Sequence, residues 1–293
     1  MNASAGQKES PALLAPGGHP TWGAMTRALS LTDRLLRRAP RVNLVRLHGV
    51  IAAGGRGRLS DTTLAPLIER AFRQGRPQAV ALVINSPGGS PAQSALIAAR
   101  IRRLAEERAV KVHAFVEDVA ASGGYWIAAA ADEIVADRVS VLGSIGVIAG
   151  GFGAPEAIAK LGLERRVYTA GQHKSQLDPF RPENPEDVAR LQRILDQMHL
   201  AFIDHVRARR GAKLDAEADL FTGQFWLGEE AMRLGLADAL GHPVPHLKAA
   251  YGEKVRIVAY EMRRPFLSRF GLALAEDALM LAEERALRAR YGM

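Results

Sequence analysis

The sequence predicts an α/β fold in which short apolar strands alternate with amphipathic helices. Continuous apolar runs recur along the chain, as at 79–84 and 111–116, and such runs are typical of strands that are covered on both faces. Segments with helical spacing separate the runs, and this alternation favours crossover connections and a parallel sheet. The 293 residues, of which 48% are hydrophobic, suffice for a large core.

The first half of the chain supplies the clearest elements. Residues 1–24 are rich in Gly, Pro, Ala and Ser without periodicity, so we expect them to be disordered. Ser60 or Asp61 is placed to cap a helix whose apolar residues share one face. The expected elements, in chain order, are strand 42–47, helix 61–74, strand 79–84, helix 91–107 and strand 111–116.

Shorter pieces continue the alternation in the second half. The expected elements are strands 134–136 and 141–147, helix 154–161, strand 165–169, helix 186–210, a short helix within 221–241, strand 255–260 and a tail helix at 270–290. Residues 171–185 are too polar and too rich in proline for regular structure. The apolar residues expected on the buried side of the long helix are Val188, Leu191, Ile194, Leu195, Met198, Phe202 and Val206.

These elements divide the chain into three parts. Residues 1–40 form a disordered, basic extension, residues 41–243 one α/β domain, and residues 244–293 a strand and an amphipathic helix that pack on the domain or on a neighbour. No whole unit repeats.

The composition excludes several kinds of site. The chain has no cysteine, which excludes disulfides, a thiol nucleophile and a thiolate metal site. Its net charge of +8 is explained best by a solvated basic face and second best by contact with anionic lipid. Binding of nucleic acid is a distant third interpretation, because no nucleic-acid-binding motif accompanies the charge. A basic stretch that could touch a membrane surface contains Arg34, Arg37, Arg38 and Arg41.

No apolar run reaches the roughly 20 residues of a membrane span, and no secretory signal begins the chain. We therefore expect a cytoplasmic protein, at most peripherally associated with a membrane.

One stretch, 118–131, reads DVAASGGYWIAAAA and places Ser122 where a strand gives way to a helix. The first turn of a helix presents unpaired N–H groups, so an anion that forms beside the hydroxyl would be stabilised there. Two interpretations follow: Ser122 is an ordinary helix N-cap, or it is a nucleophile.

A serine nucleophile needs a base, and the sequence offers two kinds. Ser122 does not lie in a G-x-S-x-G context and no HExxH is present, so the spacing of the eight histidines assembles no triad, although His173 stays open. A lysine can act instead if its surroundings keep the amine neutral. Of two lysines near this region, Lys174 in the loop GQHKSQLDPF is a better candidate than Lys160.

Several motifs in order resemble the S49 family of serine peptidases, which includes signal peptide peptidases of the SppA and SohB type. They are NSPGG at 85–89, AASGGYWIA at 120–128, GSIGV at 143–147, the loop lysine and FTGQFWLGEEAMRLGLADALG at 221–241. The resemblance implies a ClpP/crotonase-like spiral of stacked ββα units. It also implies a Ser/Lys dyad of Ser122 and Lys174, both supplied by one chain, as in the short single-repeat members.

The rest of the site follows from the same resemblance. The N–H groups of Gly89 and Gly123 would form the oxyanion hole, with Gly88 as the neighbouring alternative. Ser144 would hold the lysine amine, or else is a turn serine between glycines. Tyr125, like Trp126, would pack at the groove.

No metal or organic cofactor is implied, while the partners implied are peptides and further copies of the chain in a homo-oligomer. We therefore predict a serine endopeptidase that hydrolyses extended, apolar peptides. A crotonase-type acyl-CoA hydratase or isomerase and a non-catalytic scaffold of the same fold are the alternatives. The membrane-bound family members carry an N-terminal span, which is not found here.

Overall fold

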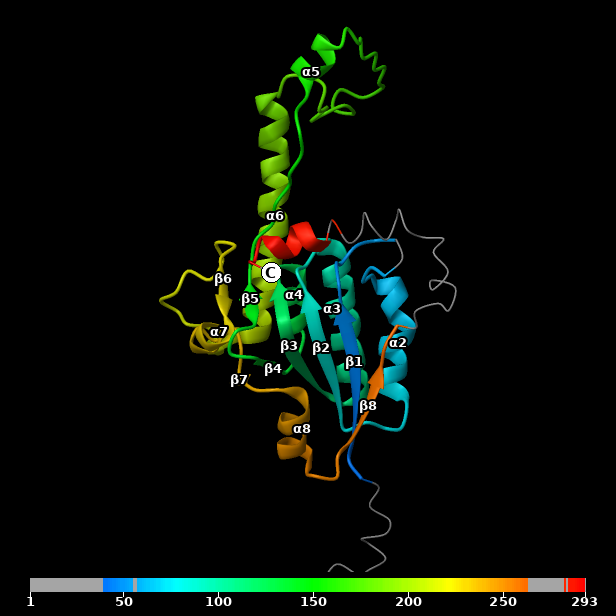
Figure 1. The fold of residues 1–293 in the computed structure, drawn as a ribbon, viewed down its shortest axis with the longest axis vertical. Helices are drawn as coiled ribbons and strands as arrows, with labels where there is room; N and C mark the ends of the chain where they lie inside the picture. The colour runs from blue at the N-terminus through cyan, green and yellow to red at the C-terminus, as the bar shows by residue number, and fades with distance from the viewer. Residues whose placement is uncertain (1–38, 55–56, 263–281, 283, 293) are drawn as a thin grey trace, which may run out of the picture. The chain divides into compact units, whose positions relative to one another are not determined.

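The fold is described from a computed structural model, which describes residues 39–54, 57–262, 282 and 284–292. The predictions made for residues 1–38 and for most of 270–290 lie outside this part of the chain. The predicted α/β class is confirmed: one mixed sheet of eight strands is flanked by helices (Figure 1).

The sheet has the order β6-β5-β3-β2-β1-β8, while β4 pairs with β3 and β7. Every pair is parallel except β5 with β6. The strands are β1 (Arg41–His48), β2 (Ala79–Ser86), β3 (Lys111–Ala121), β4 (Glu133–Ala136), β5 (Val141–Gly143), β6 (Phe225–Leu227), β7 (Ala239–Leu240) and β8 (Arg256–Tyr260).

Helices connect the strands and cover both faces of the sheet. They are α2 (Asp61–Arg73), α3 (Pro91–Arg108), α4 (Gly123–Ala129), α5 (Pro155–Lys160), α6 (Pro185–Arg210), α7 (Gly228–Arg233) and α8 (Pro243–Tyr251). The predicted cap is confirmed, because the Ser60 side chain accepts a hydrogen bond from the N–H of Thr63 at the start of α2.

Strand alternation divides the core between the two faces. All eight residues of β2 are buried, as its apolar run predicts. Val80, Leu82 and Ile84 point to the face covered by α2, α3 and α4, whereas Ala79, Ala81 and Val83 point to the face where Leu247 of α8 packs. The strands β1, β2 and β3 are parallel to one another, so their C-terminal ends lie together at one edge of the sheet. Loops and helix starts collect at this edge.

Two predictions were wrong in the segment between β5 and β6. Residues 165–169 form no strand, because this exposed stretch has no neighbouring edge to pair with. In α6, Phe202 and Val206 are buried as predicted, but Val188, Ile194 and Met198 are exposed. Figure 1 shows why: the first half of α6 runs away from the sheet, with α5 at its far end. We call residues 148–198 the arm.

Two further differences concern the ends of the domain. Helix α8 was not predicted, because Pro243 and Pro245 at its start are turn signals as much as helix starts. Arg41 lies in β1, where its guanidinium donates to Asn43 and to the hydroxyl of Tyr260. It is therefore engaged within the fold. Among the described helices, none is both long and apolar enough to cross a bilayer.

Candidate active site

Ser122 stands alone between the end of β3 and the start of α4, in an unusual backbone conformation. Its φ is +51° and its ψ is −121°, which a non-glycine residue adopts only at a cost of about 1–3 kcal/mol. Its side chain makes no capping hydrogen bond, so the interpretation of Ser122 as an ordinary N-cap is wrong. Its N–H donates to Gly143 O at 2.9 Å, which extends the pairing of β3 with β5 through the strained residue.

The two glycines after Ser122 allow α4 to start in a crowded place. A Cβ on Gly123 would lie 2.2 Å from Ser94 Oγ of α3, and one on Gly124 would lie 2.5 Å from Ser86 O of β2. Side chains at these positions would push the start of α4 away from both elements. The glycines therefore hold the N–H groups of the first turn next to the end of β2.

The NSPGG loop lies directly against this helix start. A Cβ on Gly88 would be 2.8 Å from Ser122 Cβ and 2.9 Å from Gly123 N. The N–H of Gly88 is engaged, since it donates to Ser86 Oγ at 3.2 Å. The structure thus brings the predicted residues Gly88, Ser122 and Gly123 into contact.

Gly89 is held by the main chain of Ile51, which follows β1. Ile51 N–H donates to Gly88 O at 2.8 Å, and Ser90 N–H donates to Ile51 O at 2.7 Å. In such a parallel bridge the middle residue, Gly89, directs its own N–H away from Ile51. No described group accepts a hydrogen bond from that N–H. Gly89 therefore fits an oxyanion donor better than Gly88.

Ser144 flanks Ser122 on the other side. It follows Gly143, has a φ of +51° and donates its N–H to Gln224 O at 2.7 Å. Its Oγ lies 3.4 Å from the hydroxyl of Tyr291. Ser144 therefore lies within the same site. Its contacts are compatible with a turn serine and also with a serine that holds the lysine amine.

Residues near the C-terminus also reach this edge of the sheet. Residues 284–289 are helical and are drawn in red across the strand ends in Figure 1. Arg288 donates to Asn85 Oδ1 at 3.1 Å, and the hydroxyl of Tyr291 lies 3.4 Å from Pro87 O. The ring of Tyr291 meets the ring of Phe225 edge to face at 5.1 Å. These contacts place the C-terminal residues against the NSPGG loop and Ser144, next to Ser122.

The aromatic residues of α4 were assigned wrongly. Tyr125 is fully buried rather than at a groove, and its hydroxyl donates to Leu236 O at 2.9 Å; burial raises the pKa of this phenol. The ring of Trp126 stacks on the rings of Phe202 and His205. Both side chains fix α4 to the core because they are large, apolar and partnered.

Lys174 lies elsewhere. It is exposed in the loop between α5 and α6, and Figure 1 places this segment at the end of α6 farthest from the sheet. His199 of α6 is close to the site, since its Nε2 lies 3.1 Å from Ile145 O. The helix start at Pro185 is 14 residues earlier, or about 21 Å along the axis. The expectation that one chain supplies both members of the dyad is not met by this arrangement.

The other candidate bases are engaged in contacts away from Ser122. His173 Nδ1 lies 2.7 Å from the guanidinium of Arg190 on α6, and Lys160 pairs with Glu156 on α5. His205 bonds to Trp126 O, and burial lowers the pKa of its ring. Sequence reasoning missed Ile51 and Tyr291: Ile51 acts through its main chain and gives no signal, whereas Tyr291 ends a recognisable amphipathic segment.

The relatives of this chain include a protein named as a protease and one named as an antiporter. The model of the family described as "Peptidase family S49" matches residues 105–250. A Synechocystis sp. protein named as a protease is 30% identical over 197 residues, which are 67% of this chain and 68% of that one. The Na(+)/H(+) antiporter NhaA of Brucella melitensis is 47% identical over 271 residues, 86% of this chain.

This chain covers only 37% of the length of the Brucella protein, so it spans little more than a third of that relative. Among solved structures, the 1510-N membrane-bound stomatin-specific protease gives a TM-score of 0.47 at 15% identity, covering 78% of this chain and all of that one.

Proposed function

Because this chain belongs to peptidase family S49, we propose that it is a serine peptidase with Ser122 as nucleophile and Lys174 as general base. The observation that supports Ser122 is its strained backbone, which leaves its hydroxyl unengaged at the start of α4, where Gly88 packs against Ser122 and the N–H of Gly123. Strain of this kind persists only where the surroundings enforce it, and it is common at reactive residues.

The proposed reaction is acyl transfer in two steps. The neutral amine of Lys174 takes the proton of Ser122 Oγ, and the oxygen attacks the scissile carbonyl carbon. The oxyanion accepts hydrogen bonds from the N–H groups of Gly89 and Gly123, and the lysine returns the proton to the departing amine. A water molecule, deprotonated by the same lysine, then hydrolyses the acyl-enzyme.

The placement of Lys174 supports a site built from two copies of the chain. The arm is exposed along its length and carries large apolar side chains, including Phe152, Leu161 and Tyr168, whose exposed fractions are 94%, 73% and 90%. Exposed apolar surface of this kind marks an interaction site. A neighbouring copy that receives the arm would bury this surface and bring Lys174 to the neighbour's Ser122. The proposed homo-oligomer is therefore part of the catalytic proposal.

The proposed substrates are extended peptides with apolar side chains. Phe225 is partly exposed and, together with the ring of Tyr291, lies beside Ser144, which provides apolar surface next to the nucleophile. Association with an anionic membrane surface stays a prediction that rests on the basic residues before β1.

The test of the proposal is labelling with a fluorophosphonate, which reacts with an activated serine. We expect wild-type protein to be labelled on the peptide that contains Ser122, and Ser122→Ala to remain unlabelled. Ser60→Ala is the control: it removes the cap of α2, at a cost of about 1 kcal/mol, and should still be labelled. Absence of labelling in folded wild-type protein would favour the hydratase or the scaffold and contradict a serine peptidase.

Gly89→Ala should lower kcat/KM for peptide hydrolysis by at least about 100-fold, as the loss of one oxyanion donor does. The added Cβ would lie 2.0 Å from Ile51 O and φ is +139°, so the N–H of residue 89 must turn away. Gly211→Ala is the matched control, because its φ is also positive, at +51°, but its Cβ meets nothing within 4 Å. Equal losses in the two variants would exclude a specific role for Gly89.

A further inference from the structure

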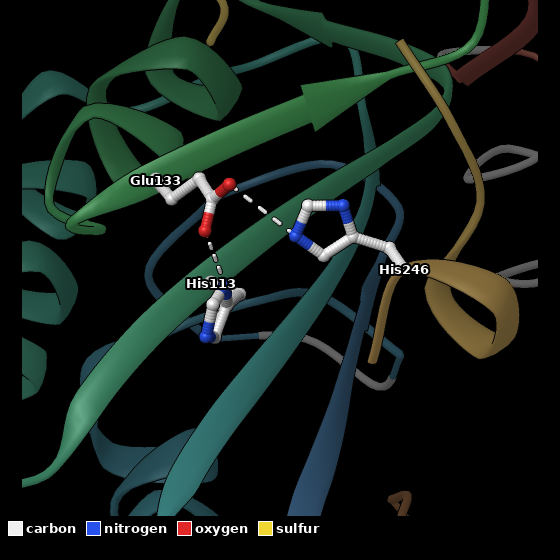
Figure 2. A group of neighbouring side chains, drawn as sticks. All are labelled: His113, Glu133 and His246. Atoms are coloured by element: carbon white, nitrogen blue, oxygen red, sulfur yellow. Dashed lines mark ion pairs between the residues drawn. The ribbon is translucent and has the colours of Figure 1, made fainter. Parts of the chain in front are cut away.

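Two histidines and a glutamate meet at the end of the sheet opposite Ser122. Figure 2 shows His113 of β3, Glu133 of β4 and His246 of α8 directed at one another. His113 Nδ1 lies 2.8 Å from one carboxylate oxygen of Glu133, and His246 Nε2 lies 3.3 Å from the other. The three groups offer ligand atoms that all lie within 4.8 Å of one another.

The fold places these three residues together. His113 and Phe115 are two residues apart on β3, and Glu133 and Val135 are two apart on β4, so all four face α8. Helix α8 packs on that face through the buried side chain of Leu247. His246, the preceding residue, is thereby held over the register pair of His113 and Glu133.

The buried ring of His113 has a nitrogen atom that lacks a hydrogen-bond partner. The side chain is 1% exposed. Its Nε2 lies 2.7 Å from the hydroxyl of Tyr251, but its Nδ1 forms no hydrogen bond despite its nearness to Glu133. When the Nε2 proton is given to Tyr251, the Nδ1 lone pair faces the carboxylate directly.

The Glu133 carboxylate lies within 3.3 Å of three nitrogen atoms, those of Lys111, His113 and His246. In the tautomer that places the His113 proton on Nε2, the Nδ1 lone pair and a carboxylate oxygen face each other at 2.8 Å with no proton between them. A buried polar atom left in this way is costly unless a partner occupies the space.

We propose that His113, Glu133 and His246 bind a divalent transition metal ion, for which Zn²⁺ is the best match. Imidazole nitrogens and a carboxylate are ligands of Zn²⁺, at about 2.0–2.2 Å, which separates tetrahedral ligand atoms by about 3.4 Å. The spacings of 2.8 and 3.3 Å are near that value and need only small side-chain shifts.

The surroundings provide the remaining features of such a site. The hydroxyl of Tyr251 lies 2.7 Å from Nε2 of His113, and in the tautomer whose Nε2 donates to it, Nδ1 is left to the metal, a common arrangement around metal ligands. The Glu133 and His246 side chains are about one fifth exposed, so an ion can enter and water can complete its coordination. The Lys111 ammonium, 3.3 Å from Glu133, is half-exposed and can swing into solvent.

The role of this ion is structural. Ser122 comes nine positions after His113, at the end of β3, which is about 30 Å along a strand. An ion here cannot reach a peptide bond beside Ser122. It would instead join α8 to β3 and β4 and stabilise that end of the sheet. This inference does not depend on the proposed function, because its readout is metal binding and the stability of α8.

Metal binding is tested on the full chain after removal of metals with a chelator. Titration with Zn²⁺ alone, followed by calorimetry, should show one site per chain, and Co²⁺ should give the visible absorption of a low-coordinate nitrogen and oxygen site. Zn²⁺ should also raise the Tm and slow hydrogen exchange in α8. Glu133→Gln and His246→Ala should lose the site, and Tyr251→Phe should weaken it by about 10-fold.

The controls separate this site from adventitious binding. His242→Ala removes a histidine just before α8 that faces Asp137 instead, at 3.4 Å, and should bind Zn²⁺ like wild type. His246 is partly exposed, so its alanine variant should stay folded, as circular dichroism can verify. Wild-type protein that binds Zn²⁺ no better than His246→Ala, or a loss of binding in His242→Ala, would overturn the proposal.

Discussion

Ser122→Ala is expected to lower kcat/KM for peptide hydrolysis by at least about 10³-fold, because no other hydroxyl can take its place as the attacking oxygen. Alanine keeps the main-chain N–H groups of Gly89 and Gly123 available, so peptide should still bind. The measurement is cleavage of a fluorogenic peptide library, with binding of an uncleaved peptide followed separately. An unchanged KM with a collapsed kcat would identify the loss as chemical.

Ser60→Ala provides the comparison for that loss. It removes a hydroxyl that caps α2 rather than one beside the glycine loop, and it costs stability without touching the reacting atoms. Its kcat/KM should stay within a few fold of wild type. Substantial cleavage by Ser122→Ala would remove this serine from the mechanism.

Lys174→Ala should lower kcat/KM for peptide hydrolysis by a similar factor. The double variant Ser122→Ala, Lys174→Ala should be hardly less active than either single variant, since a dyad acts as one unit. Lys160→Ala is the matched control, because Lys160 is an exposed lysine on the same arm that pairs with Glu156. Its activity should be near normal. Near-normal turnover by Lys174→Ala would show that the base is another group.

Mixing the two inactive single variants tests where the lysine comes from. If the arm of one copy serves the Ser122 of another, co-refolded Ser122→Ala and Lys174→Ala chains should regain about one quarter of wild-type activity, because random mixing pairs an intact serine with an intact lysine at that frequency. If one chain supplies both residues, the mixture stays inactive. Size measurements on each variant verify that assembly itself is unchanged.

The long strands of the first half of the chain and the cap of α2 could be predicted from the sequence because local chemistry determines them. The run 79–84 is apolar at every position, and a strand with two covered faces is the simplest structure that buries it. Ser60 precedes a helix with apolar spacing, and it caps that helix. The motifs NSPGG and SGGYW could be recognised as parts of one site, but the crowding that requires glycine there, such as a Cβ on Gly89 or Gly124 meeting main-chain oxygen, appears only in the structure.

Tertiary context determined the features that the sequence could not reveal. The spacing of Val188, Ile194 and Met198 predicts a buried face, but no other described element of the same chain reaches the first half of α6. The periodicity is the same whether a helix packs on its own core or on another molecule. In the same way, nothing in the residues around 113, 133 and 246 indicates that topology stacks them at one point.

The strained conformation of Ser122 was also beyond sequence reasoning. A serine before two glycines is equally suited to an N-cap and to a sharp turn from strand to helix. Which one forms depends on the Gly143 carbonyl from the neighbouring strand, more than 20 residues later in the chain. The hydroxyl is left without a cap partner by that long-range contact.

The position of Tyr291, with its hydroxyl 3.4 Å from both Pro87 O and Ser144 Oγ, has a practical consequence for handling the protein. A purification tag appended after residue 293 would begin close to Tyr291, and therefore close to Pro87 and Ser144. Such a tag could be bound or cut there in place of an added peptide. Kinetic work is therefore safer with the tag placed before β1, at the other terminus.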